Sequence, residues 1–315
     1  MIKDRSILIT GGAGFIGSIM AETLCEKNQI TILDNLSGGS LKNIEPFRDR
    51  VRFINADIRK ADSFDGIKDN FDLVVHLAAN SDVRAGSTDT KSDMDINVLG
   101  THNLLEFMRK RDIKNMIFSS TSTVYGEADV IPTPETYGPC LPISLYGASK
   151  LANEGFIWSY HHYYGIKPTI FRFANIVGRN STHGVIHDFI LKLKKNPKQL
   201  EILGDGKQEK SYMHIDDCVS AMLHIYENDS KGDVVNLGND QRTSVTRIAE
   251  IVRDAMHLSD VEFQYIGGID GRGWAGDIKI AQLSIEKMKR YGWINRYDSE
   301  QSVVKAADEI AKQMK

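Results

Sequence analysis

A glycine-rich turn near the N-terminus constrains the fold of this chain more than any other feature. The motif TGGAGFIG follows an apolar run over 6–10 and opens a helical pattern over 14–27. In this spacing Gly11 permits a tight turn, Gly14 lets the backbone approach a pyrophosphate, and Gly17 lets the helix pack closely on the strand. The helix N-terminus adds free N–H groups and the positive end of its dipole. The turn therefore predicts a strand–turn–helix unit that binds a dinucleotide.

An acidic residue stands where such a unit needs one. Asp34 ends the second apolar run, 23 residues after Gly11, and is followed by Asn35 and not by an arginine. A carboxylate there accepts hydrogen bonds from the adenosine ribose and repels a 2′-phosphate. The pair of features therefore predicts NAD, and not NADP, as the cofactor.

Short apolar runs alternate with helical patterns over the first 175 residues. We predict strands over 6–10, 30–33, 51–56, 73–77, 116–120 and 168–174, and helices over 14–27, 95–111 and 146–164. Unbroken apolar strands separated by helices indicate a parallel sheet covered on both faces. The fold class expected is α/β, a Rossmann-type doubly wound parallel sheet.

The alternation loosens after residue 175. Helical patterns cover 184–195, 215–227, 244–257 and 299–314, with short strands over 200–203, 233–237 and 261–266. This mixture predicts a smaller mixed C-terminal lobe that binds the substrate. We expect an NAD-binding domain over 1–175 with returning segments near 212–240, and a substrate lobe formed by 176–211 and 241–315.

A tyrosine and a lysine four residues apart are the first candidates for catalysis. Tyr146 and Lys150 open the helical pattern that ends near 164. Residues four apart lie on one face of a helix, so both side chains can enter one site. A nearby ammonium and a positive nicotinamide ring both favour the phenolate, which is the form that acts as a base. The stretch FSSTSTVYG reads as a strand that leads into a hydroxyl-rich turn at the carboxyl edge of the sheet. A Ser or Thr hydroxyl there can hydrogen-bond the reacting oxygen and share its proton with the tyrosine, and capping of the turn is the alternative role.

Composition excludes several other classes of protein. The net charge is −3, and the basic residues are scattered, which favours neither nucleic acid nor a membrane surface as partner. The three cysteines are far apart and lack a CxxC pair, which argues against disulfides and a zinc site, and we expect no metal. No signal-peptide pattern and no apolar run of membrane length is present, so we expect a soluble cytoplasmic protein.

At this point the chain resembles the extended short-chain dehydrogenase/reductase family of nucleotide-sugar enzymes. The motifs that carry the resemblance follow in family order: TGGAGFIG, HLAA, NVLGT, FSSTSTVYG, YGASK and RFANIVG. Within the family the chain is most similar to UDP-glucose/UDP-galactose 4-epimerases. The resemblance implies Thr121, Tyr146 and Lys150 as the catalytic set. It also implies a homodimer, paired through helices near 95–111 and 145–164.

The resemblance assigns the remaining site residues by position. It implies contacts with NAD for Gly11, Gly14, Phe15, Ile16, Gly17, Asp34, Asn35, Asp57, Ile58, Leu77, Ala78, Ala79, Asn97, Tyr146, Lys150 and Phe173. It implies contacts with the UDP-sugar for Thr121, Tyr146, Asn175, Lys210, Arg272 and Ala281. Lys210 replaces the family's phosphate-binding arginine and keeps its charge but not its fork of donors. Ala281 occupies a position that limits space near the sugar C2 substituent, and its small side chain predicts room for an N-acetyl group.

The hydroxyl-rich turn separates the reactions of the family. Dehydratases carry an Asp-Glu pair there, and UDP-glucuronate decarboxylases a Glu, whereas this chain has Ser122 and Thr123. The expected activity is therefore NAD-dependent 4-epimerisation of a UDP-hexose through a transient 4-keto sugar. The alternatives are UDP-glucuronate 4-epimerase, decarboxylase or dehydratase activity, a net NAD-dependent oxidoreductase, and a non-catalytic NAD-binding regulatory protein.

Overall fold

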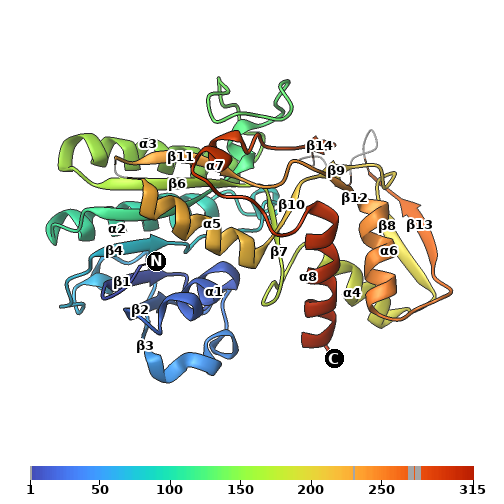
Figure 1. Cartoon of the computed structure of the whole chain (residues 1–315), viewed down its shortest axis with the longest axis horizontal. Coiled ribbons are helices and arrows are strands. Elements are labelled where there is room, and N and C mark those ends of the chain that lie inside the picture. The colour runs from blue at the N-terminus through green and yellow to red at the C-terminus, as the bar shows by residue number, and fades with distance from the viewer. Residues whose placement is uncertain (1, 230, 269–272, 274–277) are drawn as a thin grey trace. The chain divides into compact units, whose positions relative to one another are not determined.

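The structure is a computed structural model that describes residues 2–229, 231–268, 273 and 278–315. The chain divides into two compact units. The first comprises 1–127, 137–172 and 221–235, and the second comprises 128–136, 173–220 and 236–315. Figure 1 shows the chain with its elements labelled.

A seven-stranded sheet organises the first unit. Its strands are β1 (Ser6–Thr10), β2 (Gln29–Asp34), β3 (Val51–Asn55), β4 (Leu73–His76), β5 (Asn115–Thr121), β6 (Lys167–Phe173) and β11 (Asp233–Leu237). Their order in the sheet is β11-β6-β5-β4-β1-β2-β3. The pairs β1–β2, β1–β4, β2–β3 and β4–β5 are parallel, as expected for strands joined by crossover helices.

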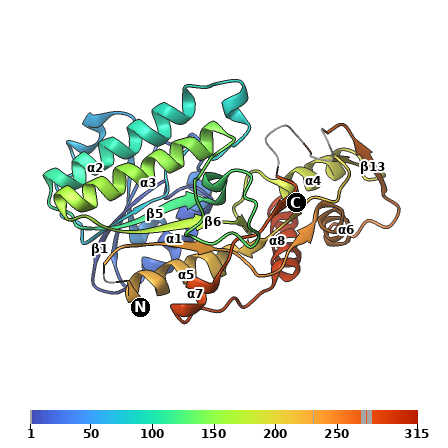
Figure 2. The ribbon, with the colours of Figure 1, turned by 90° about the horizontal axis from the view of Figure 1, so that it is seen from above.

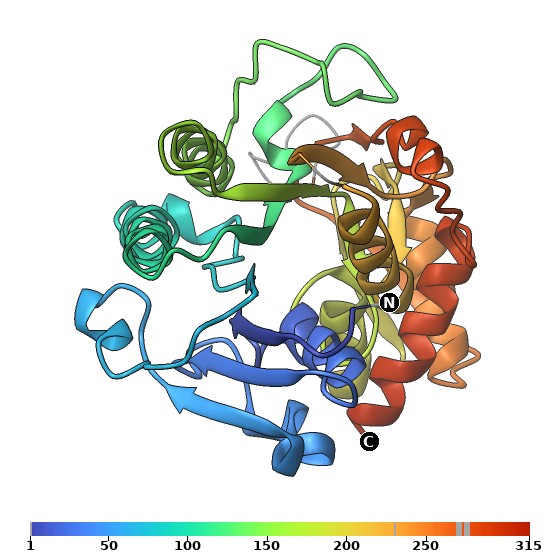
Figure 3. The same cartoon turned by 60° about the vertical axis from the view of Figure 1, so that its left-hand side comes forward.

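Helices cover both faces of this sheet. They are α1 (Phe15–Leu24), α2 (Gly100–Lys110), α3 (Leu145–Tyr164) and α5 (Ile215–Asn228). Figures 2 and 3 show α2 and α3 side by side over one face, and α1 and α5 over the other. The strands between them are buried almost throughout, which explains why their sequences are continuously apolar.

A π-helix precedes α2. It spans Met94–Leu99 and continues directly into α2 at Gly100. Periodicity alone predicted one regular helix over 95–111, and in this respect the prediction was wrong. Short π-helical segments of this kind are frequent at functional sites.

The second unit is a mixture of short strands and helices. Its strands are β7 (Asn175–Val177), β8 (Gln199–Leu203), β9 (Glu209–Lys210), β10 (Tyr212–His214), β12 (Thr243–Ser244), β13 (Glu262–Ile266) and β14 (Ile280–Ala281). Its helices are α4 (Val185–Lys195), α6 (Val245–Ala255), α7 (Glu286–Arg290) and α8 (Ser299–Gln313). The apolar faces of α4, α6 and α8 pack together with β8 in one core.

The predicted fold class is confirmed: the main sheet is of the Rossmann type, and the chain also forms a smaller mixed unit. Among the described residues, no helix is both long enough and apolar enough to cross a membrane. The assignment of NAD and the UDP-sugar to separate domains stays a proposal.

Candidate functional site

The candidate site begins where the strand order of the main sheet reverses. β2 and β3 lie on one side of β1, and β4 and β5 lie on the other. Ligands of doubly wound sheets bind at the carboxyl ends of the strands that flank such a reversal. Gly11 follows β1, and Ala78 follows β4. A Cβ added to Gly11 would lie 2.7 Å from the Ala78 backbone nitrogen, so the two loops are in direct contact.

The glycine turn has the geometry of a phosphate cradle. Gly11 has φ +71°, and a Cβ on Gly17 would lie 2.1 Å from the Gly11 carbonyl oxygen, so neither position admits a side chain. A Cβ on Gly14 would meet, within 4 Å, only that same oxygen, at 3.2 Å. α1 starts at Phe15 with no side-chain cap, so the N–H groups of its first turn are available to an anion. The cradle fits the pyrophosphate of a dinucleotide.

Asp34 is buried at the end of β2, with 7% of its surface exposed. Its Oδ2 accepts a hydrogen bond from the Ala13 backbone nitrogen at 3.0 Å, and its Oδ1 accepts one from Leu36 at 2.8 Å. The carboxylate therefore holds the glycine turn to β2. Each oxygen keeps a further lone pair that a ribose hydroxyl can use.

The neighbouring acid is more strongly engaged within the protein. Asp57 accepts hydrogen bonds from the Arg59 guanidinium at 2.6–3.0 Å and from the Asn35 side-chain amide at 3.2 Å. The hydrogen bonds from Arg59 lower the pKa of Asp57 to about 2. Ile58 packs into the core, where a Cβ on Gly100 would lie 2.5 Å from its Cδ1. Contacts of Asn35, Asp57 and Ile58 with NAD stay predictions.

The loop after β4 is held by Asn97 of the π-helix. The loop contains Leu77, Ala78 and Ala79, and all three are partly exposed. Asn97 is 1% exposed; its Oδ1 accepts from the Asn80 backbone nitrogen at 2.8 Å, and its Nδ2 donates to Ser149 Oγ at 2.9 Å. Asn97 thus positions this loop against α3, and the predicted direct contact with NAD remains untested.

The structure brings the three predicted catalytic residues together. Thr121 ends β5, Tyr146 lies in the first turn of α3, and Lys150 lies one turn further on. The Thr121 and Tyr146 side chains share a hydrogen bond. Lys150 is 2% exposed, and its Nζ donates to the Ser119 carbonyl oxygen at 2.8 Å. The Nζ lies 6.0 Å from the centroid of the Tyr146 ring.

Burial changes the titration of both groups. It raises the pKa of Tyr146 to about 12; the hydrogen bond with Thr121 opposes this effect, and the charge of Asp93 adds to it. Burial also lowers the pKa of Lys150 to about 7, against the opposing charges of Glu154 and Asp93. A further positive charge beside the phenol is therefore needed before it acts as a base near neutral pH.

A buried ion pair under the site was missed in the sequence. Glu154 accepts hydrogen bonds from the Arg172 guanidinium, with Nε to Oε1 at 3.0 Å and Nη2 to Oε2 at 2.6 Å. Ser120 also donates to Glu154, and the Arg172 guanidinium carbon lies 4.7 Å from the Tyr125 ring centroid. The position of Glu154, one turn after Lys150, was the available signal. The network stabilises the end of β5. There the Ser119 carbonyl oxygen accepts the hydrogen bond of Lys150, and the Thr121 side chain contacts Tyr146.

The predicted substrate residues of the second unit lie on two small sheets. Asn175 begins β7, and its Nδ2 donates to the Ser211 carbonyl oxygen at 3.1 Å. Lys210 in β9 and Ala281 in β14 are register partners in parallel strands. The Ser211 backbone nitrogen bonds to the Ala281 carbonyl oxygen at 3.0 Å. Register partners project from the same face, so Lys210 and Ala281 are neighbours.

Phe173 and Arg272 are the remaining residues that were predicted to contact NAD or the substrate. Phe173 ends β6 and is 8% exposed. Arg272 lies outside the described residues.

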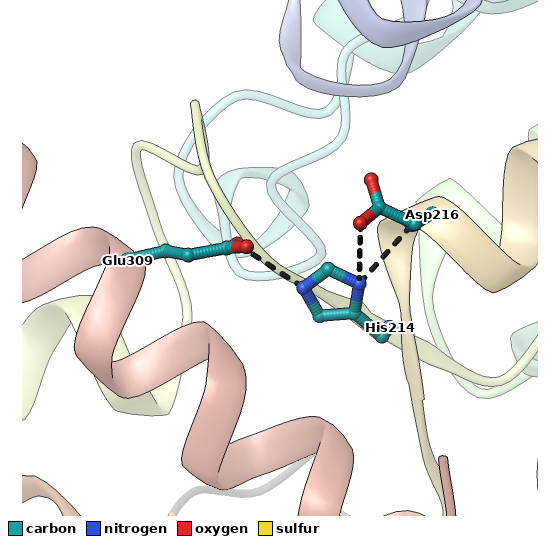
Figure 4. Close-up of side chains that lie close together, drawn as sticks. All are labelled: His214, Asp216 and Glu309. Carbon is teal, nitrogen blue, oxygen red and sulfur yellow. Dashed lines mark hydrogen bonds and ion pairs between the residues drawn. The ribbon is translucent and has the colours of Figure 1, made fainter. Parts of the chain in front are cut away.

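A second cluster of titratable groups lies in the second unit (Figure 4). His214 is fully buried, and its Nε2 lies 3.1 Å from Glu309 Oε2. Its Nδ1 accepts a hydrogen bond from the Asp216 backbone nitrogen at 3.2 Å. Asp216 pairs with Arg179 at 2.5 Å and with Lys305 at 2.7 Å. The side chains of His214, Asp216 and Glu309 are of the types that bind metal ions, and they lie close together. Arg179 and Lys305 already balance the charges of the two carboxylates. We therefore interpret the cluster as a structural link between β10 and α8.

Comparison with known proteins places this geometry in context. The model of the family described as "NAD dependent epimerase/dehydratase family" matches residues 7–238. A UDP-glucose 4-epimerase of Corynebacterium glutamicum is 30% identical over 96% of this chain and 94% of its own length.

Solved structures of nucleotide-sugar 4-epimerases are also similar to this chain in sequence and fold. The crystal structure of a UDP-galactose 4-epimerase is 36% identical, covers 98% of this chain and 100% of its own, and superposes with a TM-score of 0.89. A UDP-N-acetylglucosamine 4-epimerase of Methanobrevibacter ruminantium, solved with UDP-N-acetylmuramic acid, is 30% identical over 99% of this chain and 100% of its own, with a TM-score of 0.88.

Proposed function

Because the chain belongs to the NAD dependent epimerase/dehydratase family, we propose that it catalyses the 4-epimerisation of a UDP-hexose. The first substrate pair is UDP-galactose and UDP-glucose, and UDP-GalNAc and UDP-GlcNAc form the second. The observation that carries the proposal is the arrangement of Thr121, Tyr146 and Lys150 at the end of β5 and the start of α3. The family and the names of the relatives support it.

The prediction of NAD as cofactor is confirmed at the level of the family. The residues that would hold it are those of the cradle. The open face of Gly14 and the first turn of α1 would receive the pyrophosphate. Asp34, through its remaining lone pairs, would receive the adenosine ribose.

The reaction needs one proton to leave and return at the sugar 4-oxygen. NAD⁺, when held by the cradle, would supply the hydride acceptor for C4 and the positive charge of its nicotinamide. Tyr146 then takes the proton of the 4-OH, with the Thr121 hydroxyl in hydrogen-bond contact. The charge of Lys150 favours the phenolate. Tyr146 returns the same proton to the 4-oxygen of the product, so the protein ends each turnover in its starting state.

The turn after Thr121 favours epimerisation over elimination. It spans Ser122–Tyr125, and Ser122 and Thr123 occupy the positions where dehydratases carry an acidic pair. The Thr123 hydroxyl donates to the Thr121 hydroxyl at 3.1 Å. A hydroxyl in this place supports the catalytic threonine, but it does not supply the acid and base that loss of water requires.

Holding the diphosphate while the hexose turns over is the remaining requirement. Lys210 would contact a phosphate, and the small side chain of its register partner Ala281 would leave room beside the sugar C2 substituent. Asn175 would meet the diphosphate as well. Few specific groups are then needed around the sugar, which must present both faces of C4.

A spectrophotometric assay distinguishes the proposed reaction from a net oxidation. The purified protein is mixed with UDP-glucose and excess NAD⁺, and the absorbance of free NADH is followed. An epimerase regenerates its cofactor in each cycle, so we expect no lasting increase. A steady increase in absorbance would assign a net dehydrogenase and overturn the proposal. Epimerisation of UDP-glucuronate would also leave no lasting NADH, so that alternative substrate is tested by proton NMR of the sugar products.

A further inference from the structure

Among the residues that the structure describes, a buried carboxylate near the catalytic pair forms no salt bridge with a lysine or an arginine. Asp93 precedes the π-helix and is 2% exposed. Its Oδ1 accepts hydrogen bonds from the side-chain amides of Asn80 at 3.1 Å and Asn97 at 3.2 Å. Its Oδ2 is buried and lacks a hydrogen-bond partner among the residues that the structure describes. Buried carboxylates are usually paired with a cation or fully hydrogen-bonded, so this arrangement requires an explanation.

Hydrogen bonds connect Asp93 to the turn of α3 that carries the catalytic residues. Asn97 Nδ2 bridges Asp93 Oδ1 and Ser149 Oγ, and Ser149 Oγ in turn donates to the Tyr146 carbonyl oxygen at 2.8 Å. The short helix Ala85–Ser87 covers the carboxylate from outside, since a Cβ on Gly86 would lie 3.4 Å from Asp93 Oδ2. The acid is therefore enclosed between its own loop and α3.

The second acid near Lys150 differs in this respect. Glu154 also raises the pKa of Lys150, but both of its oxygens are occupied by Arg172, and Ser120 donates to one of them. Its charge is already paired. Within the described part of the chain Asp93 has no such partner, so the positive charge that acts on it is that of Lys150 itself.

We propose that ionised Asp93 is a positioning residue whose negative charge keeps Lys150 protonated in its buried site, beside Tyr146. The inference deepens the proposed function, because a cationic Lys150 is what the phenolate of Tyr146 requires. Asn97 of the π-helix provides the link: its side-chain amide donates both to Asp93, the residue before this helix, and to Ser149 in the turn of α3 between the two catalytic side chains.

The charges that face Asp93 come from several elements. Burial raises the pKa of Asp93, and the exposed acids Asp89 and Asp82 of the preceding loop raise it further. The hydrogen bond from Asn80 and the charge of Lys150 lower it. The pKa of Asp93 is raised on balance. The charge of Lys150 opposes that rise, and the charge of Asp93 in turn raises the pKa of Lys150.

The substitution Asp93→Asn separates the charge from the structure. Asparagine keeps an oxygen at the Oδ1 position for the amides of Asn80 and Asn97, and it places its own amide where Oδ2 has no partner. Asp95→Asn is the matched control, because Asp95 lies two residues further on, in the first turn of the π-helix, but its side chain is 35% exposed and pairs with Lys91 at 3.6 Å.

The titration of Lys150 gives a readout that does not depend on activity. Its pKa of about 7 separates it from ordinary lysines, which titrate near 10.4. Protein with isotopically labelled lysine ε-carbons is titrated by carbon NMR, and Lys150→Met assigns the signal. In Asp93→Asn we expect the midpoint to fall by about one pH unit. In Asp95→Asn we expect it to stay in place.

The pH–rate profile supplies the second readout. A negative charge raises the pKa of both Tyr146 and Lys150, so its removal should move both limbs of kcat toward lower pH. A uniform loss of rate with unmoved limbs would indicate a merely structural role. An unchanged Lys150 midpoint in Asp93→Asn overturns the proposal, whether or not the protein epimerises UDP-sugars. If Asp93→Asn fails to fold, Asp93→Ser gives the same two readouts.

Discussion

A buried phenol next to a buried ammonium behaves differently from either group in water. Burial raises the pKa of Tyr146 to about 12 and lowers the pKa of Lys150 to about 7. Each change disfavours the charged form that catalysis needs. The site therefore depends on its neighbours: Thr121 supports the phenolate by a hydrogen bond, and Asp93 and Glu154 support the ammonium. A bound positive ring would act on the phenol in the same direction as Thr121.

Removal of the phenol hydroxyl tests the base directly. We expect Tyr146→Phe to lower kcat by about 100-fold or more, the usual contribution of a positioned acid–base group. Tyr160→Phe is the control, because Tyr160 lies on the same helix and bonds instead to Glu106 at 2.7 Å. The kcat of Tyr160→Phe should match that of the wild type. Near-normal turnover by Tyr146→Phe would remove this residue from the mechanism.

Substrate choice is a second question at the scale of one side chain. We expect Ala281→Tyr to abolish turnover of UDP-GalNAc and UDP-GlcNAc while UDP-galactose is still converted, because the phenol fills the space proposed for the N-acetyl group. Initial rates on both substrate pairs measure the effect. An equal loss on both pairs would show that Ala281 does not distinguish the sugars.

Sequence patterns predict single side chains when the constraint is local. The spacing of Tyr146 and Lys150 predicted that they share one face of a helix, and the structure brings them together with Thr121. Asp93 and the Glu154–Arg172 pair were not predicted. Their roles depend on burial and on contacts between residues far apart in the chain, which no local pattern records.

Most long elements were predicted well, but the helix predicted over 14–27 ends already at Leu24, the helix predicted over 95–111 begins as a π-helix, and the very short strands were not predicted. The seven strands of the main sheet and the helices α3, α4 and α8 agree with the apolar periodicity to within a residue or two. The strands β9, β12 and β14 have two residues each, too few to produce a pattern. They exist because distant segments pair, such as Lys210 with Thr243 and Ala281.

The packing of α1 on the glycine turn leads to a prediction about stability. Gly17→Ala places a methyl group 2.1 Å from the Gly11 carbonyl oxygen, which backbone atoms cannot avoid. We expect a loss of about 1–3 kcal/mol in the free energy of unfolding, as for other overpacked sites. Denaturant unfolding measures it.

Gly155→Ala is the matched control for this experiment. Gly155 lies within α3, and an added Cβ there meets no atom within 4 Å. Alanine should stabilise this helix by up to about 1 kcal/mol. Equal behaviour of the two variants would contradict the close packing of helix and turn.

At the scale of the whole molecule, the two units divide the proposed work. The first contains the glycine cradle, Asp34 and the catalytic set, and the second contains Asn175, Lys210 and Ala281. The alternation of strands and helices predicted the first unit in its main features. The second could be predicted only as a mixture, because its small sheets are formed by long-range pairing.

The central claim is that this chain interconverts UDP-hexoses at C4 with a cofactor that it keeps. Proton NMR of the purified protein with UDP-galactose and no added cofactor tests this claim most directly. We expect the anomeric signal of UDP-glucose to appear and to grow to a constant ratio, since bound NAD is regenerated in every cycle. Absence of that signal, with NAD supplied and with UDP-GalNAc and UDP-glucuronate also unchanged, would contradict epimerisation.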